Sequence, residues 1–146
     1  MFKVIIEMPK GDDRRRHLGY DKSGFVDIGP IKDVIQVNNG IMPVDYGYVP
    51  NTFNANDKDE VDVLLISNKK YSVGGEVVVE PIGLLRREDG DDKMIVVDVG
   101  DPRKSCVELP DEVRKSITEF FGYKHKIISI EGAEVAIKYL EDNKIQ

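Results

Sequence analysis

The segment NDKDEVDVLLIS, residues 56–67, places three aspartates at the start of a strongly apolar run. Asp57 and Asp59 point to the same side of an extended chain, because side chains alternate with period two. Asp62 comes where the chain enters its core, immediately before residues 63–66. Clustered carboxylates at a buried edge repel one another, so they need protonation or a cation. A solvated turn before a strand is the ordinary alternative for such a charge run.

The apolar run at residues 61–67 predicts a buried strand, and β-branched segments on both sides of it predict further strands. The predicted strands cover residues 2–8, 24–28, 32–37, 61–67, 76–85 and 94–99. The strand at residues 76–85 is expected to bend at Pro81 and Gly83. A charged loop is predicted after residue 8, and residues 38–60 are predicted to form a long ordered loop.

Two amphipathic helices are predicted near the C-terminal end of the chain. The first covers residues 110–123, with Pro110 near its start and Gly122 at its end, where these residues favour helix boundaries. A short apolar link at residues 126–130 leads to the second helix, residues 132–144. Strands first and helices last predict an α+β fold with a small closed or nearly closed β-barrel.

Composition limits the function classes that this chain can serve. The 146 residues are enough for one domain with a proper core, and we expect residues 1–146 to form it. The net charge of −6 argues against a general nucleic-acid binder. No apolar run approaches the ~20 residues that cross a bilayer, so no membrane span is predicted. A single cysteine, Cys106, excludes an internal disulfide and suits a reducing cytoplasm.

A second acidic segment, EDGDD at residues 88–92, ends the long strand pair. Two strand ends of one small barrel can meet, and two carboxylate clusters there favour a hard divalent cation such as Mg²⁺. An EF-hand is excluded because Asn68, not Glu, is the twelfth residue counted from Asp57. No His or Cys has the spacing of zinc ligands, so a zinc site is not predicted either.

Cationic and phenolic residues lie near the acidic segments in the sequence. Lys93 follows the second acidic segment, Tyr123 and Lys124 follow the first predicted helix, and residues 14–16 are three arginines. Each of these cations taken alone is most simply a surface residue. As a set around a metal cluster, they provide the donors that an oxyanion substrate needs.

Seven segments together make the chain resemble the soluble inorganic pyrophosphatases of family I. The segments are IIEMPKG (5–11), SGFVD (23–27), PVDYGYVPNT (43–52), DKDEVDVLL (57–65), PIGLL (81–85), EDGDDK (88–93) and FFGYK (120–124). The resemblance implies an OB-like, closed five-stranded β-barrel with the two C-terminal helices packed outside. It also implies Mg²⁺-dependent hydrolysis of pyrophosphate to two phosphates with several ions, for which Mn²⁺ can substitute. We further expect a cytoplasmic homo-oligomer that binds neither nucleic acid nor membrane.

The resemblance assigns roles to individual residues. Asp59 matches the carboxylate that accepts a proton from the attacking water, a general-base role. The positions that match metal ligands are Glu7, Asp57, Asp62, Asp89 and Asp92. The positions that match phosphate-binding residues are Arg16, Tyr46, Lys93, Tyr123 and Lys124. The local alignment slips by one, so His17 is an alternative to Arg16.

The chain departs from the family pattern in three places. The family carries arginine after the F-V-D segment, where this chain has Ile28, so a phosphate contact is missing unless Lys32, Arg86 or another cation supplies it. The D-G-D-P motif reads DKDE at residues 57–60, without its glycine and proline. The turn at residues 88–93 is shorter than usual, so matching its aspartates requires a gap.

Two alternative functions follow from these observations. Loss of the arginine at Ile28 is compatible with a weakened enzyme or one that acts on another phosphoanhydride. A small OB-like barrel is also compatible with a module that binds an oligonucleotide or another polyanion. The net negative charge counts against the binding module.

Overall fold

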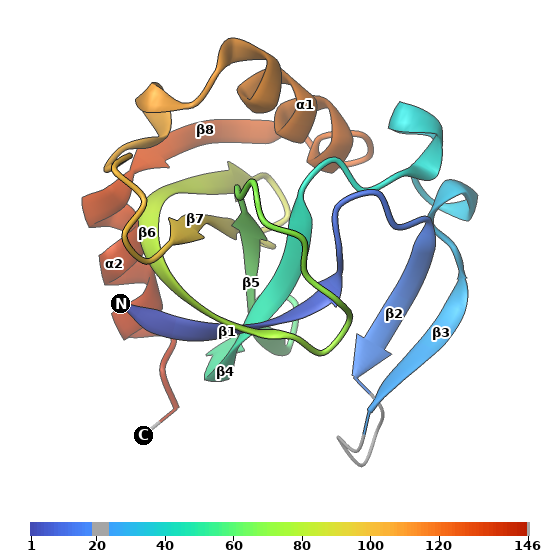
Figure 1. The fold of residues 1–146 in the computed structure, drawn as a ribbon, viewed down its shortest axis with the longest axis horizontal. Coiled ribbons are helices and arrows are strands. Elements are labelled where there is room, and N and C mark those ends of the chain that lie inside the picture. The colour runs from blue at the N-terminus through green and yellow to red at the C-terminus, as the bar shows by residue number, and fades with distance from the viewer. Residues whose placement is uncertain (19–23, 146) are drawn as a thin grey trace.

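The computed structural model describes residues 1–18 and 24–145, and its centre is a five-stranded barrel (Figure 1). Around the barrel the order is β1 (Phe2–Met8), β4 (Asp45–Asn54), β5 (Asp59–Leu65), β7 (Lys93–Asp98) and β6 (Glu76–Arg87). Pairing of β1 with β6 closes the barrel, and β8 (Ile127–Gly132) adds a sixth strand along β6. The strands β5 and β7 are parallel, and the other pairs are antiparallel. The predicted α+β fold with a closed five-stranded barrel is confirmed.

Strand β5 is buried on both faces, which explains its continuous apolar sequence. On one face, Leu64 packs in a core cluster with Ile117 and Phe120 of helix α1 (Asp111–Phe121). On the other face, Val63 and its neighbours pack with Leu140 of helix α2 (Ala133–Asp142). Both predicted C-terminal helices are therefore confirmed, one against each core cluster. In the described residues, no helix has the length and apolar character that crossing a membrane requires.

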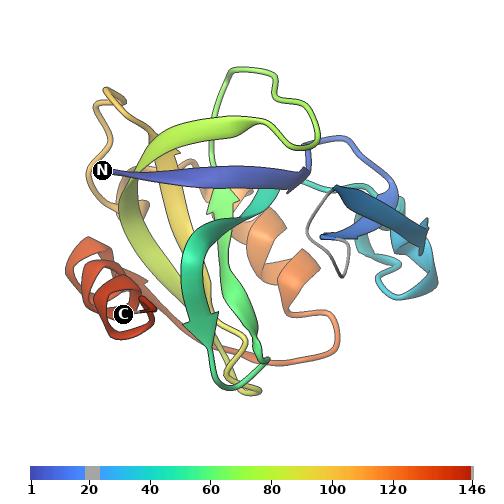
Figure 2. The same cartoon turned by 90° about the horizontal axis from the view of Figure 1, so that it is seen from below.

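A two-stranded hairpin, β2 (Arg14–Leu18) and β3 (Phe25–Pro30), stands beside the barrel (Figure 2). Three short 3-10 helices complete the described fold. They are η1 (Ile31–Asp33), η2 (Val37–Gly40) and η3 (Cys106–Glu108).

The prediction of a strand at residues 32–37 is wrong. The backbone amides of Val34 and Ile35, just after η1, both donate to the carbonyl oxygen of Ile31 in η1 at 2.9 Å. Ile31 is buried and Val34 and Ile35 are partly buried, so the apolar residues recur at the i, i+3, i+4 spacing of a helix. This spacing, rather than β-branching, decides the local structure.

Three predicted loops contain strands. The charged loop after residue 8 contains β2, which pairs with β3, and the apolar link at residues 126–130 lies largely within β8, which pairs with β6. The long predicted loop at residues 38–60 contains β4. In β4, a Cβ on Gly47 would lie 2.1 Å from Ile5 O, so glycine allows β1 and β4 to approach.

Candidate active site

Three aspartates, from two adjacent turns of the barrel and from strand β5, meet at one point. Asp57 precedes β5, Asp62 lies on β5, and Asp91 ends the turn between β6 and β7. One carboxylate oxygen from each lies within 4.8 Å of the others, a spacing compatible with a shared metal ion. These three residues are called the Asp cluster below.

Hydrogen bonds between the two turns hold the Asp cluster together. Asn54 Nδ2 donates to Gly90 O at 3.1 Å, and Asn54 Oδ1 accepts from the amide of Asn56 at 2.9 Å. Gly90 has φ +78°, and a Cβ there would lie 2.7 Å from Asn56, so the turns can approach this closely only with glycine. Lys58 adopts φ +60° at the position where the family motif has glycine. The DKDE segment therefore makes a left-handed turn with a non-glycine residue.

A buried lysine lies against the Asp cluster. The parallel pairing of β5 and β7 sets Asp62 beside Lys93, whose Nζ is 2.8 Å from Asp62 Oδ2 and 3.0 Å from Asp91 Oδ1. Lys93 Nζ also donates to Tyr46 Oη at 3.2 Å. Lys93 faces two of the three carboxylates, and Arg87, which also pairs with Asp89, lies 3.7 Å from Asp91 Oδ2. The carboxylates outnumber these cations, so the region retains negative charge when all of them are ionised.

The pKa values of the acidic groups reflect this excess of negative charge. Burial, with the neighbouring Asp91, raises the pKa of Asp57 to about 7. Burial raises the pKa of Asp62 to about 6, although Lys93 opposes the shift. Burial and the charges of Asp62 and Asp59 raise the pKa of Glu7 to about 8. A cation that neutralises these groups would favour their ionised forms.

A cavity of about 200 Å³ adjoins the Asp cluster, and its lining combines apolar side chains with several cations. The cations among its lining residues outnumber the carboxylates. Its polar lining residues are Arg15, Arg16, Tyr46, Arg87, Asp91 and Lys93. The Tyr46 ring stacks on Phe121 with centroids 5.8 Å apart, which fixes the phenol at the cavity wall. Asp91 belongs to both the Asp cluster and the cavity lining, and Lys93 contacts the cluster and also lines the cavity. A carboxylate pole and a cationic pole are therefore contiguous.

Asp91, rather than the predicted Asp92, completes the Asp cluster. Asp92 Oδ1 instead accepts the backbone amide of Arg87 at 2.9 Å, and Asp92 Oδ2 lies 3.7 Å from Arg86. Asp91 is two residues before Lys93 and meets its ammonium group, whereas Asp92 is bound to the preceding strand. The length of the shortened turn does not reveal which aspartate faces Asp62.

Three of the other predicted acidic residues lie around the cluster. Asp59 is exposed, and its amide donates to Asp57 Oδ1 at 3.1 Å, which ties the two residues together. Glu7 is buried on β1, within electrostatic reach of Asp62. Asp89 binds the guanidinium of Arg87, whose hydrogen bonds lower the pKa of Asp89 to about 2.

The predicted phosphate-binding residues divide into two groups. Arg16, Tyr46 and Lys93 line the cavity. Tyr123 and Lys124 are exposed just past the end of α1 and do not belong to its lining, and the Tyr123 hydroxyl donates to Gln36. The side chain of His17, the alternative to Arg16, lies outside the described part of the structure. Arg15 was expected only as one of the three arginines at residues 14–16, and Arg87 and Asp91 were not assigned a role. Of these two, only Asp91 could have been indicated, by its spacing from Lys93.

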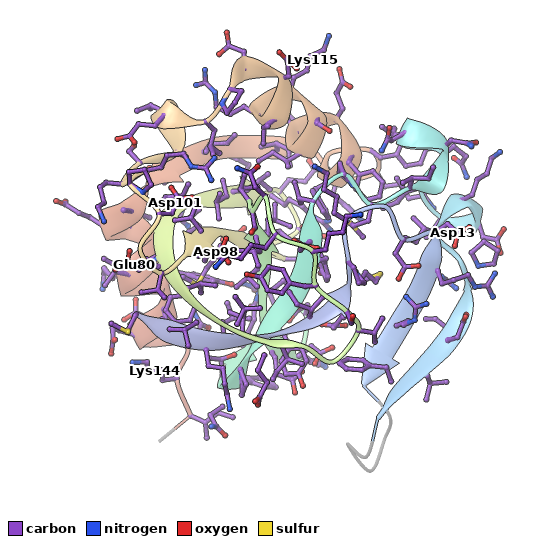
Figure 3. All side chains as sticks on the ribbon, viewed as in Figure 1. Asp13, Glu80, Asp98, Asp101, Lys115 and Lys144 are labelled. Carbon is purple, nitrogen blue, oxygen red and sulfur yellow. The ribbon has the colours of Figure 1, made fainter. Side chains whose placement is uncertain are left out.

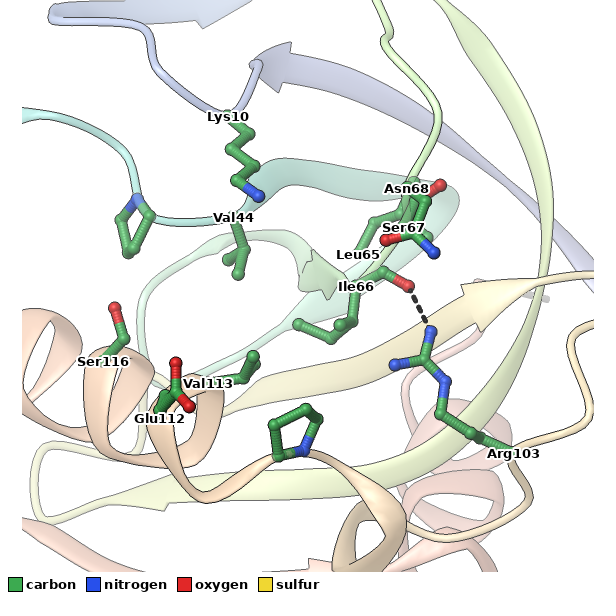
Figure 4. A pocket seen from close by; sticks show the side chains of 12 residues that line it. Lys10, Val44, Leu65, Ile66, Ser67, Asn68, Arg103, Glu112, Val113 and Ser116 are labelled. Atoms are coloured by element: carbon green, nitrogen blue, oxygen red, sulfur yellow. Dashed lines mark hydrogen bonds between the residues drawn. The ribbon is translucent and has the colours of Figure 1, made fainter.

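A second cavity, of about 270 Å³, opens between β5 and α1 (Figure 4). Lys10 and Glu112 stand in its wall with opposite charges. Arg103 is bound by Asp101, with Nη2 at 2.8 Å from Asp101 Oδ2, and also donates to Ile66 O at 3.2 Å. Asp98 and Asp101 lie on the side of the barrel away from Asp13, which marks the hairpin (Figure 3). No group of metal-ligating residues was found there among the described residues.

Known proteins with similar sequences and structures agree on one family. The family model for inorganic pyrophosphatase matches residues 4–145. An inorganic pyrophosphatase of Leifsonia xyli subsp. xyli is 32% identical over 143 residues, covering 90% of this chain and 84% of that protein. One of Aquifex pyrophilus is 35% identical over 129 residues, covering 82% of this chain and 70% of that protein. The crystal structure of an inorganic pyrophosphatase from Neisseria gonorrhoeae superposes with a TM-score of 0.81 at 25% identity, covering 97% of this chain and 87% of that one.

Proposed function

The chain belongs to the inorganic pyrophosphatase family and hydrolyses pyrophosphate, and we propose that it does so with Mg²⁺ held by the Asp cluster and with Asp59 as general base. The observation that supports this proposal most strongly is the contact between the two poles of the site. The cluster offers oxygen ligands to a cation, and the adjoining cavity offers donors to a phosphate.

The donor set of the Asp cluster fits a hard divalent cation. Three carboxylates with ligand oxygens within 4.8 Å, and no cysteine or histidine among them, match the oxygen preference of Mg²⁺. Asp57, Asp62 and Asp91 are proposed as ligands, Asp91 in the place where Asp92 was expected. Glu7 and Asp89 are proposed to act toward further ions, either directly or through water. Bound Mg²⁺ would supply Lewis-acid activation of water and neutralise phosphate charge.

The side chains of this chain account for the remaining needs of phosphoryl transfer, which are positioning and charge neutralisation. Lys93 and Tyr46 are held rigidly, because Lys93 is buried and the Tyr46 ring stacks on Phe121. They and Arg16 are proposed to orient a phosphate group in the cavity by charge-assisted hydrogen bonds. Tyr123 and Lys124 are proposed to approach the second phosphate from the end of α1.

Asp59 is proposed to accept a proton from the attacking water. It is exposed, so it meets solvent, and its backbone amide is anchored to Asp57. A general base contributes about 10²–10⁴-fold to rate, provided that it lies within hydrogen-bond reach of the proton it accepts. Mutation of this one carboxylate therefore separates proton transfer from metal binding.

The variant Asp59→Asn tests the role of Asp59. We expect kcat for pyrophosphate to fall by about 10²–10⁴-fold, with an unchanged circular dichroism spectrum and retained Mn²⁺ binding. The matched control is Glu60→Gln, which removes one carboxylate from the next position of β5 and should keep activity within about threefold. Normal turnover by Asp59→Asn would refute the assigned role.

Substrate choice tests whether Ile28 alters the reaction. Phosphate release is measured from pyrophosphate, tripolyphosphate and ATP, each with Mg²⁺ and with chelator. We expect fast, Mg²⁺-dependent release from pyrophosphate and slow release from the two larger anhydrides. A preference for either larger anhydride would favour the altered-substrate alternative.

Cytoplasmic location and homo-oligomeric assembly are also proposed. The one cysteine, Cys106, is a buried free thiol, as suits a reducing compartment. Ile128 and Ile137 expose 63% and 49% of their surface, and such apolar side chains are candidates for contacts between subunits. Light scattering coupled to gel filtration measures the oligomeric state, and a monomer at all concentrations would refute assembly.

A further inference from the structure

The hairpin does not provide the guanidinium that the family resemblance expects at Ile28. Ile28 lies on β3 and is partly exposed. The neighbouring Arg14 is bound by Asp27 through both carboxylate oxygens, at 2.9 and 3.0 Å. Arg15 also lines the cavity, with its Nη2 donating to Ile28 O at 3.0 Å. Arg16 is already proposed to bind a phosphate group, and a further guanidinium in place of the one expected at Ile28 can come from another element of the cavity wall.

Arg87, the last residue of β6, reaches the same cavity from the barrel, whereas Arg15 and Arg16 reach it from the hairpin. It lines the cavity together with Arg16, Tyr46 and Lys93, and only 13% of its side chain is exposed. Its position is fixed by three hydrogen bonds. Nε donates to Asp89 Oδ1 at 3.0 Å, Nη2 donates to Asp89 Oδ2, and Nη1 donates to Phe121 O at 3.4 Å. A guanidinium held this way loses little further side-chain freedom when it binds a ligand.

The hydrogen-bonding capacity of Arg87 is not exhausted by these contacts. An arginine side chain has five N–H donors, and three of those on Arg87 are used within the described residues. The remaining two are on Nη1 and Nη2, and the Nη2 contact with Asp91 Oδ2, at 3.7 Å, is too long for a hydrogen bond. Two N–H groups at the cavity wall are therefore available to an acceptor.

We propose that Arg87 is a substrate-binding residue, which gives a phosphate group of pyrophosphate the guanidinium contact that is missing at Ile28. This assignment rests on the proposed function of the site. Asp89 orients the guanidinium through one edge, and the free N–H groups of Nη1 and Nη2 bind phosphate oxygens. Because such contacts use the planar fork of arginine, lysine at this position should replace the charge but not the geometry.

The two cations named as alternatives on sequence grounds fit this role less well. Arg86 precedes Arg87 on β6, so its side chain points to the other face of the strand. It is 42% exposed, pairs with Asp92 and is not part of the cavity lining. Lys32 is exposed and is also outside the lining.

The test compares Arg87→Met and Arg87→Lys with Arg86→Met and with Arg114→Met, a control at a partly exposed position of α1 outside the cavity lining. Binding of methylenediphosphonate, a pyrophosphate analogue that is not hydrolysed, is measured by calorimetry in Mg²⁺. Mn²⁺ binding without any phosphate ligand is measured in parallel. We expect Arg87→Met to weaken analogue binding by about 10- to 100-fold, Arg87→Lys by less, and the other two variants by less than twofold.

Mn²⁺ binding separates this role from a structural one. Arg87→Met removes a cation from the vicinity of Asp89 and Asp91, so Mn²⁺ affinity should stay the same or rise while analogue affinity falls. Equal analogue affinity for Arg87→Met and the wild type would overturn the proposal, as would a loss confined to Arg86→Met. Wild-type turnover of pyrophosphate is measured on the same preparation. Active wild type with an unaffected Arg87→Met refutes only this inference, whereas inactive wild type refutes the proposed function.

Discussion

Two cavities of similar volume open on this barrel, and they differ in how their charges are balanced. In the cavity between β5 and α1, Arg103 is bound by Asp101 and Ile66, and the lining also holds the oppositely charged Lys10 and Glu112. In the cavity beside the Asp cluster, the charged lining residues are four cations and one carboxylate, Asp91, through which the cavity adjoins the rest of the cluster. The larger cavity, about 270 Å³ against about 200 Å³, is the one with balanced charges.

The difference teaches that volume does not locate the site in this protein. A polar group that is satisfied by its own neighbours gains little from a ligand, because binding must first break an existing contact. The Asp cluster has excess negative charge that Lys93 only partly neutralises, and burial, together with the neighbouring Asp91, raises the pKa of Asp57 and Asp62. The charges of the cavity beside the Asp cluster thus favour ligand binding, whereas those of the cavity between β5 and α1 favour stability.

Removal of the central cation should have the largest effect on stability. Lys93→Met leaves Asp62 and Asp91 buried without their partner, and loss of one member of a buried pair costs about 3–5 kcal/mol. We expect this loss in the free energy of unfolding, measured by urea denaturation at pH 8 with chelator. Addition of Mg²⁺ should restore more stability to Lys93→Met than to the wild type. A loss below about 1 kcal/mol would show that the Asp cluster is already neutral in solution.

The two regions should also respond differently to pH. The pKa values of Asp57, Asp62 and Glu7 are raised in the folded state, to about 7, 6 and 8, so the folded state binds more protons than the unfolded one. Stability without divalent cations should therefore fall as pH rises from about 4 to about 8. Thermal unfolding in chelator across this range measures the slope.

Two variants assign that slope to one region. Asp57→Asn removes one titrating group and should flatten the decline. Asp101→Asn should leave it unchanged, because Arg103 lowers the pKa of Asp101, which is then ionised in both states over this range. The same slope in Asp57→Asn as in the wild type would contradict the assignment.

The smallest effect is expected in the second cavity. Arg103→Met removes hydrogen bonds to Asp101 and Ile66 from a partly exposed side chain, which should cost about 1 kcal/mol. Pyrophosphate turnover should remain within about twofold of wild type, because no proposed ligand is touched. A large loss of turnover with little change in stability would give the second cavity a role in the reaction.

The elements that sequence predicted best are those with a strong local pattern. The buried strand β5 and both helices follow from apolar runs and helix boundary residues in the chain itself. Strands β2 and β8 were missed because charged or short segments become strands only when a partner edge, β3 or β6, is present. Strand β4 was missed because Gly47 serves a close approach to Ile5 that no local pattern reveals.

The candidate site was predicted in kind, but not in every residue. Asp57 and Asp62 are adjacent in sequence to the strand that positions them, so their convergence could be foreseen. The choice of Asp91 over Asp92 depends on the pairing of Asp62 with Lys93 across two strands, which the sequence does not specify. Arg87 belongs to the site through the shape of a cavity formed by residues distant in the chain.

The measurement that tests the Asp cluster most directly is Mn²⁺ binding to the variants Asp91→Asn and Asp92→Asn, monitored by electron paramagnetic resonance. Circular dichroism confirms that each variant is folded. The geometry predicts that Asp91→Asn loses the tightest Mn²⁺ site, by about tenfold or more in affinity, while Asp92→Asn retains it. Retention of the tight site in Asp91→Asn, with its loss in folded Asp92→Asn, would contradict the account and return the ligand role to Asp92.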